Sequence, residues 1–136
     1  MSKANTTEND VLDAVLRGVD PSWRSGAQRY VALHTADPGE AGSAVTSEAT
    51  YTSYARVGVT GATGFSAASG GSTANTGLIQ FPQCTGGTNT LTHVSIVTTA
   101  SGAGQILYSG ALGSSLAVAN LIQPQFGIGA LVVTED

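Results

Sequence analysis

Hydrophobic and polar side chains alternate in short runs along most of this chain, and clusters of Gly, Pro, Asn, Asp and Ser separate the runs. Alternation with a period of two is typical of strands with one buried face, and the clusters are typical of turns. The β-rich runs fall at residues 29–35, 51–60, 78–81, 90–99, 105–112, 121–126 and 130–134. This pattern predicts a mainly β fold, an antiparallel β-sandwich or jelly roll of about seven or eight short strands.

Residues 7–17 depart from the alternation and show helical spacing instead. The apolar residues of this segment lie on one face of a helix, at Val11, Leu12, Val15 and Leu16. Acidic residues precede them, and Gly18 follows as a terminating residue. A helix of this length is not stable alone, so we expect its apolar face to dock on another surface.

The size of the chain fits a single domain over residues 1–136. Within it we expect a flexible start at 1–6, the helix at 7–17 and the β-sandwich at 29–134. No apolar run reaches the roughly 20 residues that cross a bilayer, and the polar first ten residues do not form a secretion signal. The net charge of −4 argues against a nucleic-acid-binding surface.

Residues 57–134 contain no Asp, Glu, Lys or Arg, and all five basic residues precede them. About a quarter of the residues of an ordinary soluble domain are charged, so this run is unusual for a solitary protein. Its Thr, Ser, Asn and Gln side chains can be covered by a neighbouring subunit without burying an unpaired charge. We therefore expect the domain to be packed in an assembly.

The sequence contains no recognisable catalytic, cofactor-binding or metal-binding motif, so we expect no enzyme activity and no cofactor. No carboxylate lies between Glu48 and Glu135 to form a catalytic pair. His34 and His93 lie within strands, and their spacing to Asp37 does not suggest a zinc site. The lone Cys84 has no local base, so we expect an inert thiol.

Several segments match a known family in order along the chain. They include Tyr-Val-Ala-Leu-His-Thr-Ala-Asp-Pro-Gly at 30–39 and Asn-Thr-Gly-Leu-Ile-Gln-Phe-Pro at 75–82, together with 10–18, 48, 54–56, 91–96 and 107–112. In these segments the chain resembles small structural proteins of tailed bacteriophages, some labelled tail fibre proteins and others serving as capsid decoration or cement proteins. The resemblance implies a virion component that is made in the cytoplasm of the bacterial host and has no catalytic residues.

Between these locations, the compact sandwich without a fibrous repeat favours a capsid decoration protein. Such a protein would bind the major capsid protein and copies of itself, as a dimer or trimer, and stabilise the head, with neither nucleic acid nor membrane as a partner. The alternative is a tail or tail-fibre subunit for host attachment, in which Tyr51, Tyr54, Phe65 and Tyr108 could stack on a host glycan.

The candidate partner interface lies in the charged N-terminal third, at Trp23, Arg24, Arg29 and Arg56. Two alternatives stay open for these residues. Trp23 would otherwise close one end of the core, and the arginines would otherwise be solvated or paired within the chain with Asp20, Asp37 and Glu48.

Overall fold

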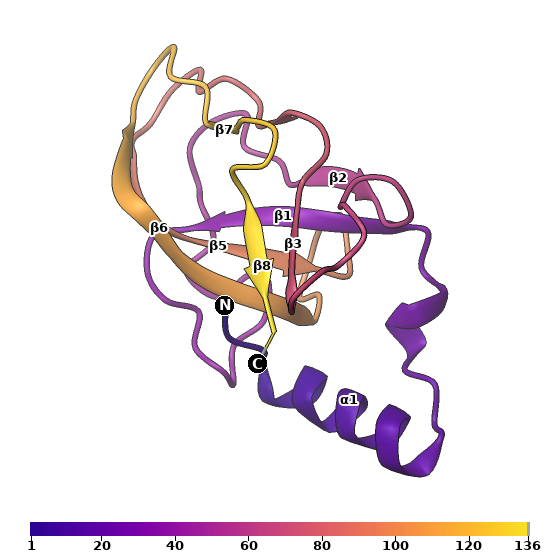
Figure 1. The fold of residues 1–136 in the computed structure, drawn as a ribbon. Helices are drawn as coiled ribbons and strands as arrows, with labels where there is room; N and C mark the ends of the chain where they lie inside the picture. Colours follow the sequence, from indigo (N-terminus) through magenta and orange to yellow (C-terminus); the bar gives the residue numbers. More distant parts are fainter. Residues whose placement is uncertain (136) are drawn as a thin grey trace.

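The computed structural model describes residues 1–135, and its largest element is a four-stranded antiparallel sheet (Figure 1). The strand order is β2-β1-β5-β6, formed by β2 (Val57–Thr60), β1 (Gln28–His34), β5 (Asn89–Val97) and β6 (Ile106–Val118). Strands β5 and β6, which correspond to the predicted runs at 90–99 and 105–112, form a hairpin. Strands β1 and β5 lie in the middle of the sheet, and residues 31–34 of β1 are buried.

Two short strand pairs complete the sandwich. Strand β3 (Ser72–Ala74) pairs with β8 (Val132–Thr134), and β4 (Ile79–Gln80) pairs with β7 (Gln125–Phe126). Figure 1 shows β3 and β8 crossing in front of the four-stranded sheet. One buried cluster joins the layers, with Leu33 and Val94 from the sheet packed among Ile79, Phe81 and Leu131 from the second layer. The prediction of a mainly β, antiparallel sandwich is confirmed.

Individual strands differ from the sequence pattern where tertiary pairing decides their ends. The run at 51–60 forms a strand only at Val57–Thr60. Strand β6 continues to Val118, past the predicted end at residue 112, because Leu116 and its neighbours pair with β5 around Leu91, beyond a register shift in which β6 carries the extra residues. Strand β3 lies inside the segment 66–75, which the sequence pattern predicts as a loop.

The N-terminal residues are held by the body of the protein, where the sequence predicts a flexible start at 1–6. Ser2 pairs with Ser109 of β6 through two backbone hydrogen bonds of 2.8 Å. The Met1 ammonium group donates to Thr134 Oγ1 at 3.3 Å, and Lys3 forms an ion pair with Glu135. Residues 1 and 135 therefore lie on the same side of the molecule (Figure 1).

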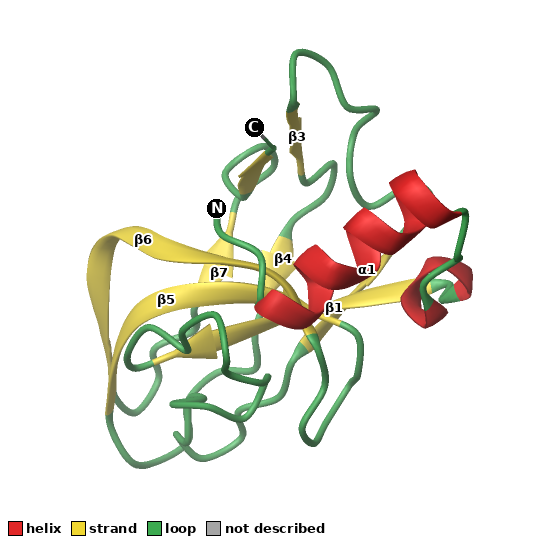
Figure 2. Cartoon of the chain, turned by 90° about the horizontal axis from the view of Figure 1, so that it is seen from below, coloured by secondary structure: helices red, strands yellow, loops and turns green. Residues whose placement is uncertain are grey.

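Helix α1 (Asn5–Arg17) begins two residues before the predicted start and ends, as expected, at Gly18 with a left-handed φ of 68°. Thr7 does not cap the helix. Its hydroxyl is buried and donates to the Ile106 carbonyl at 2.6 Å, and the Gln105 amide donates to Thr7 Oγ1 and Asp10 Oδ2. The helix is thus attached to β6 mainly through polar contacts, beneath one end of the sheet (Figure 2).

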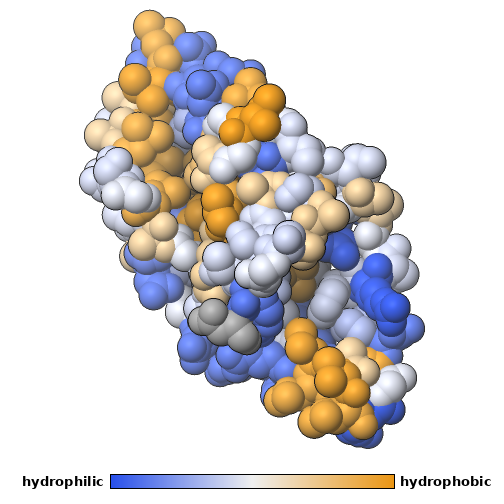
Figure 3. Space-filling view, in the orientation of Figure 1, coloured by the Kyte–Doolittle hydropathy of each residue, from blue (hydrophilic) through white to orange (hydrophobic). Residues whose placement is uncertain are grey.

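The apolar face of α1 does not dock, and this corrects the expectation from the sequence. Leu12, Val15 and Leu16 are 56%, 74% and 75% exposed, and Val11 alone of the predicted face is half-buried. Figure 3 shows the resulting apolar patch over α1. The orientation of the helix explains this: the face that meets the body carries Thr7 and Asp10, which lie roughly half a turn from Leu12 and Leu16.

Candidate functional site

A groove of about 790 Å³ lies between α1, the short 3₁₀ helix η1 (Ser22–Ser25) and strands β5, β6 and β8. Its floor is apolar and is formed by Ile96, Leu107 and Val133, which belong to one buried cluster. Segments far apart in the sequence meet here, because residues 60–68 approach the same groove from the other side. Two other hollows on the described residues are smaller, at about 210 and 240 Å³.

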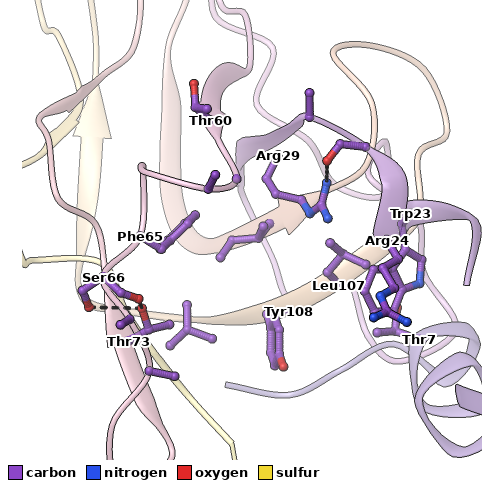
Figure 4. A pocket seen from close by; sticks show the side chains of 18 of the residues that line it. Thr7, Trp23, Arg24, Arg29, Thr60, Phe65, Ser66, Thr73, Leu107 and Tyr108 are labelled. Carbon is purple, nitrogen blue, oxygen red and sulfur yellow. Dashed lines mark hydrogen bonds between the residues drawn. The ribbon is translucent and has the colours of Figure 1, made fainter. Parts of the chain in front are cut away.

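Aromatic side chains line the groove. Figure 4 shows Trp23 and Phe65 at opposite ends, with Tyr108 between them. Trp23 Nε1 donates to Asp10 Oδ2 at 2.8 Å, which fixes η1 against α1. The Tyr108 hydroxyl donates to Glu135 Oε2 at 2.6 Å, and burial raises the pKa of Tyr108 to about 12, so the phenol is a neutral donor near pH 7. Trp23 is therefore half-buried between η1 and α1, and it also lines the groove.

Two of the predicted interface arginines, Arg24 and Arg29, also line this groove. Arg24 forms an exposed ion pair with Asp20, one of the partners that the sequence left open. The Arg29 guanidinium donates only to the carbonyl oxygens of Gly26 and Gln28, at 2.9 and 3.0 Å. Within residues 1–135, Arg29 is the one basic side chain without a carboxylate partner, so its charge stays available at the groove.

Arg56, the fourth predicted interface residue, lies away from this groove and inside the protein. Its Nε and Nη2 atoms donate to the two carboxylate oxygens of Glu48 at 2.6 and 2.8 Å. It also donates to the carbonyl oxygens of Thr99 and Gly102, and only 2% of its side chain is exposed. Arg56 is therefore paired with Glu48 of its own chain, which is one of the two possibilities that the sequence left open. Its guanidinium is not accessible to a partner in this structure.

The aromatic residues considered for glycan stacking divide between core and groove. Tyr51 is 3% exposed and donates to the Pro82 carbonyl, and Tyr54 stacks on Phe81 with ring centroids 6.3 Å apart. Tyr51 is therefore not available to a sugar, and Tyr54 is half-buried with its hydroxyl bonded to Glu48 and to the Leu33 amide. Phe65 and Tyr108 are half-buried at the groove and keep part of their surface exposed.

The histidines and the cysteine have structural partners. His34 is fully buried, with Nδ1 donating to the Thr46 carbonyl at 2.9 Å and Nε2 accepting from Ser95 Oγ at 2.7 Å. Cys84 is buried, and its Sγ donates to the Gly86 carbonyl at 3.1 Å. Among residues 1–135 no three His, Cys, Asp or Glu side chains gather in a metal-binding arrangement.

Sequence reasoning missed the groove itself. The sequence pattern names Phe65 and Tyr108 only as candidates for stacking on a glycan, and it does not place the two rings at one groove. The available signal was the concentration of small residues at 66–74, since Ala and Ser side chains leave space beside a larger neighbour. That signal could not show which strands would face the space, because the strands concerned are far apart in sequence.

A second group of exposed apolar side chains lies in or beside β4, the end of β6 and β7, and comprises Leu78, Leu116, Leu121, Ile122 and Ile128. The connection between β6 and β7 lies at the end of the molecule away from α1 (Figure 1). Leu121 is 68% exposed and adopts a left-handed φ of 73°, a strained conformation for a leucine. Hydrogen bonds to Gln83 and Cys84 hold it there. The protein therefore presents apolar surface at both ends.

Comparison with known proteins gives one family. The family model described as podophage GP4 fiber I protein gp80 matches residues 2–134 of the chain. No curated protein matches the chain. None of the described helices is long and apolar enough to span a membrane.

Proposed function

This chain belongs to the family of the podophage GP4 fiber I protein gp80, and we propose on this basis that it is a non-enzymatic subunit of a phage tail fibre. The family match, which covers residues 2–134, carries the proposal and supports a structural protein of the bacteriophage virion. Its description fits the tail-fibre alternative from the sequence better than capsid decoration.

The surface of the protein supports a role in assembly. The segment 57–134 has no ionic side chain, and it forms seven of the eight strands. Apolar residues stay exposed on α1 and around Leu121, at opposite ends of the molecule. Patches of this kind on a small protein mark contact surfaces, because an isolated soluble chain gains nothing from exposing them. Neighbouring subunits can cover both ends without desolvating a charge in the sheet.

The hydrogen bonds and ion pairs of three carboxylates support a non-enzymatic role. Glu48 is paired with Arg56, Asp10 accepts from Trp23, and Glu135 accepts from Lys3 and Tyr108. A general acid or base must face a substrate with its reactive oxygen free. These carboxylates instead hold elements of the fold together.

Labelling of intact particles tests the location. Antibody fragments against the chain, coupled to gold, are expected to decorate the tail or its junction with the head, and densitometry of purified virions is expected to give few copies per particle. Uniform labelling of the head, with hundreds of copies, would reject the fibre proposal.

Capsid decoration is the second candidate, because the described residues form one sandwich without a shaft or fibrous repeat. Head labelling together with thermal fragility of particles lacking the protein would support it. Host attachment through a glycan is a further outcome, tested by titrating the protein with host surface polysaccharide. Saturable binding that Tyr108→Ala removes would support it, since Tyr108 keeps a partly exposed ring at the groove.

A further inference from the structure

The exposed face of α1 and the groove beside it are complementary, and we propose that α1 of one copy of the chain occupies the groove of a second copy. This contact would make the protein a closed homo-oligomer. The inference deepens the proposed structural role, but it concerns the purified chain. Its test can therefore fail independently of the virion labelling.

The face that α1 offers is a continuous stripe. Glu8, Leu12, Val15 and Leu16 follow each other at spacings of four, three and one residues, which places them on one side of the helix. The stripe is about 12 Å long at the helical rise. All four residues are exposed, so nothing in the described chain covers this side.

The groove offers the matching apolar surface. Trp23 and Phe65 bound it, and Ile96 and Leu107 lie in its floor (Figure 4). Its volume of about 790 Å³ is in the range of sites that enclose medium-sized groups, so it can accept the Leu and Val side chains of two helical turns. Three of the four stripe residues, Leu12, Val15 and Leu16, are aliphatic and can pack against the aromatic side chains of the groove.

The charged residues at the two surfaces favour a second copy of the chain as the occupant of the groove. Among residues 1–135, Glu8 is the one carboxylate with neither a hydrogen bond nor an ion pair, and it lies at the start of the exposed stripe. Arg29 is the one basic side chain without a carboxylate, and it lies at the groove. Among the described residues Asp10, Asp37 and Glu40 also lack a basic partner, but each accepts a hydrogen bond within the chain. Glu8 and Arg29 are therefore free to pair with each other, and they lie on the two surfaces that would meet. Such pairing fixes orientation and register in an interface.

The position of α1 allows this contact to produce a closed oligomer. Its inner side contributes Thr7 and Val11 to the groove of its own chain, while its outer side is exposed. Each copy thus supplies one helix face and one groove. Reciprocal insertion gives a two-fold dimer, and insertion in one direction around a circle gives a ring.

Light scattering after size-exclusion chromatography tests the contact with four single variants and one double variant. Wild-type protein is expected to form an oligomer, and Leu16→Glu to weaken it at least about tenfold, because a charge would be buried in an apolar groove. Leu121→Glu is the matched control, since this leucine is similarly exposed and the proposed contact leaves its end of the molecule free for other virion proteins. Glu8→Lys and Arg29→Glu are each expected to weaken the oligomer about tenfold, and their combination to restore it.

Several results would overturn the proposal. One is a wild-type monomer at about 100 µM, a concentration well above the range in which interfaces of standard size associate. Another is an oligomer that Leu16→Glu leaves unchanged. A third is an oligomer that Leu121→Glu dissociates instead. Failure of the double charge exchange to restore association would reject the groove as the binding site. Circular dichroism checks that each variant is folded, and Val15→Asp replaces Leu16→Glu if that variant does not fold.

Discussion

Arg56 and Glu48 form a bidentate ion pair with N–O distances of 2.6 and 2.8 Å. Only 2% of the arginine side chain and 17% of the glutamate side chain are exposed. The Tyr54 hydroxyl donates to the same carboxylate, and the Arg56 guanidinium also reaches the hairpin turn at Gly102. The pair therefore ties the loop after β1 to the β5–β6 turn. It was open from sequence whether Arg56 faced a partner protein or an acid of its own chain.

Removing Arg56 is expected to destabilise the protein severely. Arg56→Ala leaves the Glu48 carboxylate partly buried without its cation, which costs about 3–5 kcal/mol of unfolding free energy. Urea denaturation followed by circular dichroism measures the change. Arg24→Ala is the matched control, because its ion pair with Asp20 is exposed and should contribute less than about 1 kcal/mol. Equal effects of the two substitutions would contradict the structural role of Arg56.

Stability is expected to fall as the pH drops below about 6.5, because of His34. Burial lowers the pKa of His34 below its ordinary value of 6.5, so the native state holds the ring neutral while the unfolded chain takes up a proton. Its neighbours Thr46 and Ser95 hold the neutral form, with one ring nitrogen donating and the other accepting. The contribution is complete above pH 6.5 and is lost on acidification, with a slope of up to about 1.4 kcal/mol per pH unit.

Urea midpoints measured at steps between pH 7.5 and pH 5 test this dependence. The His34→Gln variant should be less stable at every pH and should lose most of the slope over this range. His93→Gln is the control, since His93 keeps partly exposed surface on the neighbouring strand, and it should retain the slope. A slope that survives in the His34 variant would show that another group is responsible.

Leu121→Asn is expected to stabilise the isolated protein by about 0.5–1 kcal/mol, because asparagine tolerates the left-handed conformation that strains leucine. Thermal unfolding measures this, and Ile128→Asn is the control for loss of an exposed apolar side chain without a strained φ. If Leu121 serves as a contact in the virion, the more stable variant should be incorporated less efficiently into particles. A destabilised variant would mean that the leucine packs against neighbours more than its exposure indicates.

Trp23 is the single tryptophan of the chain, and it should report on occupation of the groove. Covering its exposed edge by a second copy removes water, so emission should shift to shorter wavelength as the oligomer forms. Dilution should reverse the shift in wild-type protein, and the Leu16→Glu variant should show the unshifted spectrum at every concentration. Emission that does not change with concentration, while light scattering shows association, would place the contact elsewhere.

The fold class could be predicted from the sequence because alternation and turn residues are local signals. The segments 29–35 and 90–99 correspond within one or two residues to β1 and β5. The remaining strand ends could not be predicted, because pairing with distant segments sets them. Ser72–Ala74, for example, becomes a strand only through its contact with residues 132–134.

The candidate site was predictable in part. Trp23, Arg24 and Arg29 gather at one groove, as expected for residues of a contact surface, although their role in binding stays a prediction. Arg56 could not be separated from them, because its partner Glu48 lies across a loop whose path the sequence does not specify. The expectation that the apolar face of α1 docks was wrong, because residue spacing identifies an apolar stripe but not which face contacts the body of the protein. The hydrogen bonds of Thr7 and Asp10 orient the helix with its polar face inward.

The joining of Ser2 to Ser109, with Met1 beside Thr134, has a consequence for engineering and for evolution. Because both ends of the described chain emerge together, a few linking residues would close the polypeptide into a circle, and new ends could be opened in a surface loop. The same arrangement would let the whole unit be inserted into a loop of a larger protein as a pendant module, with little strain on its host.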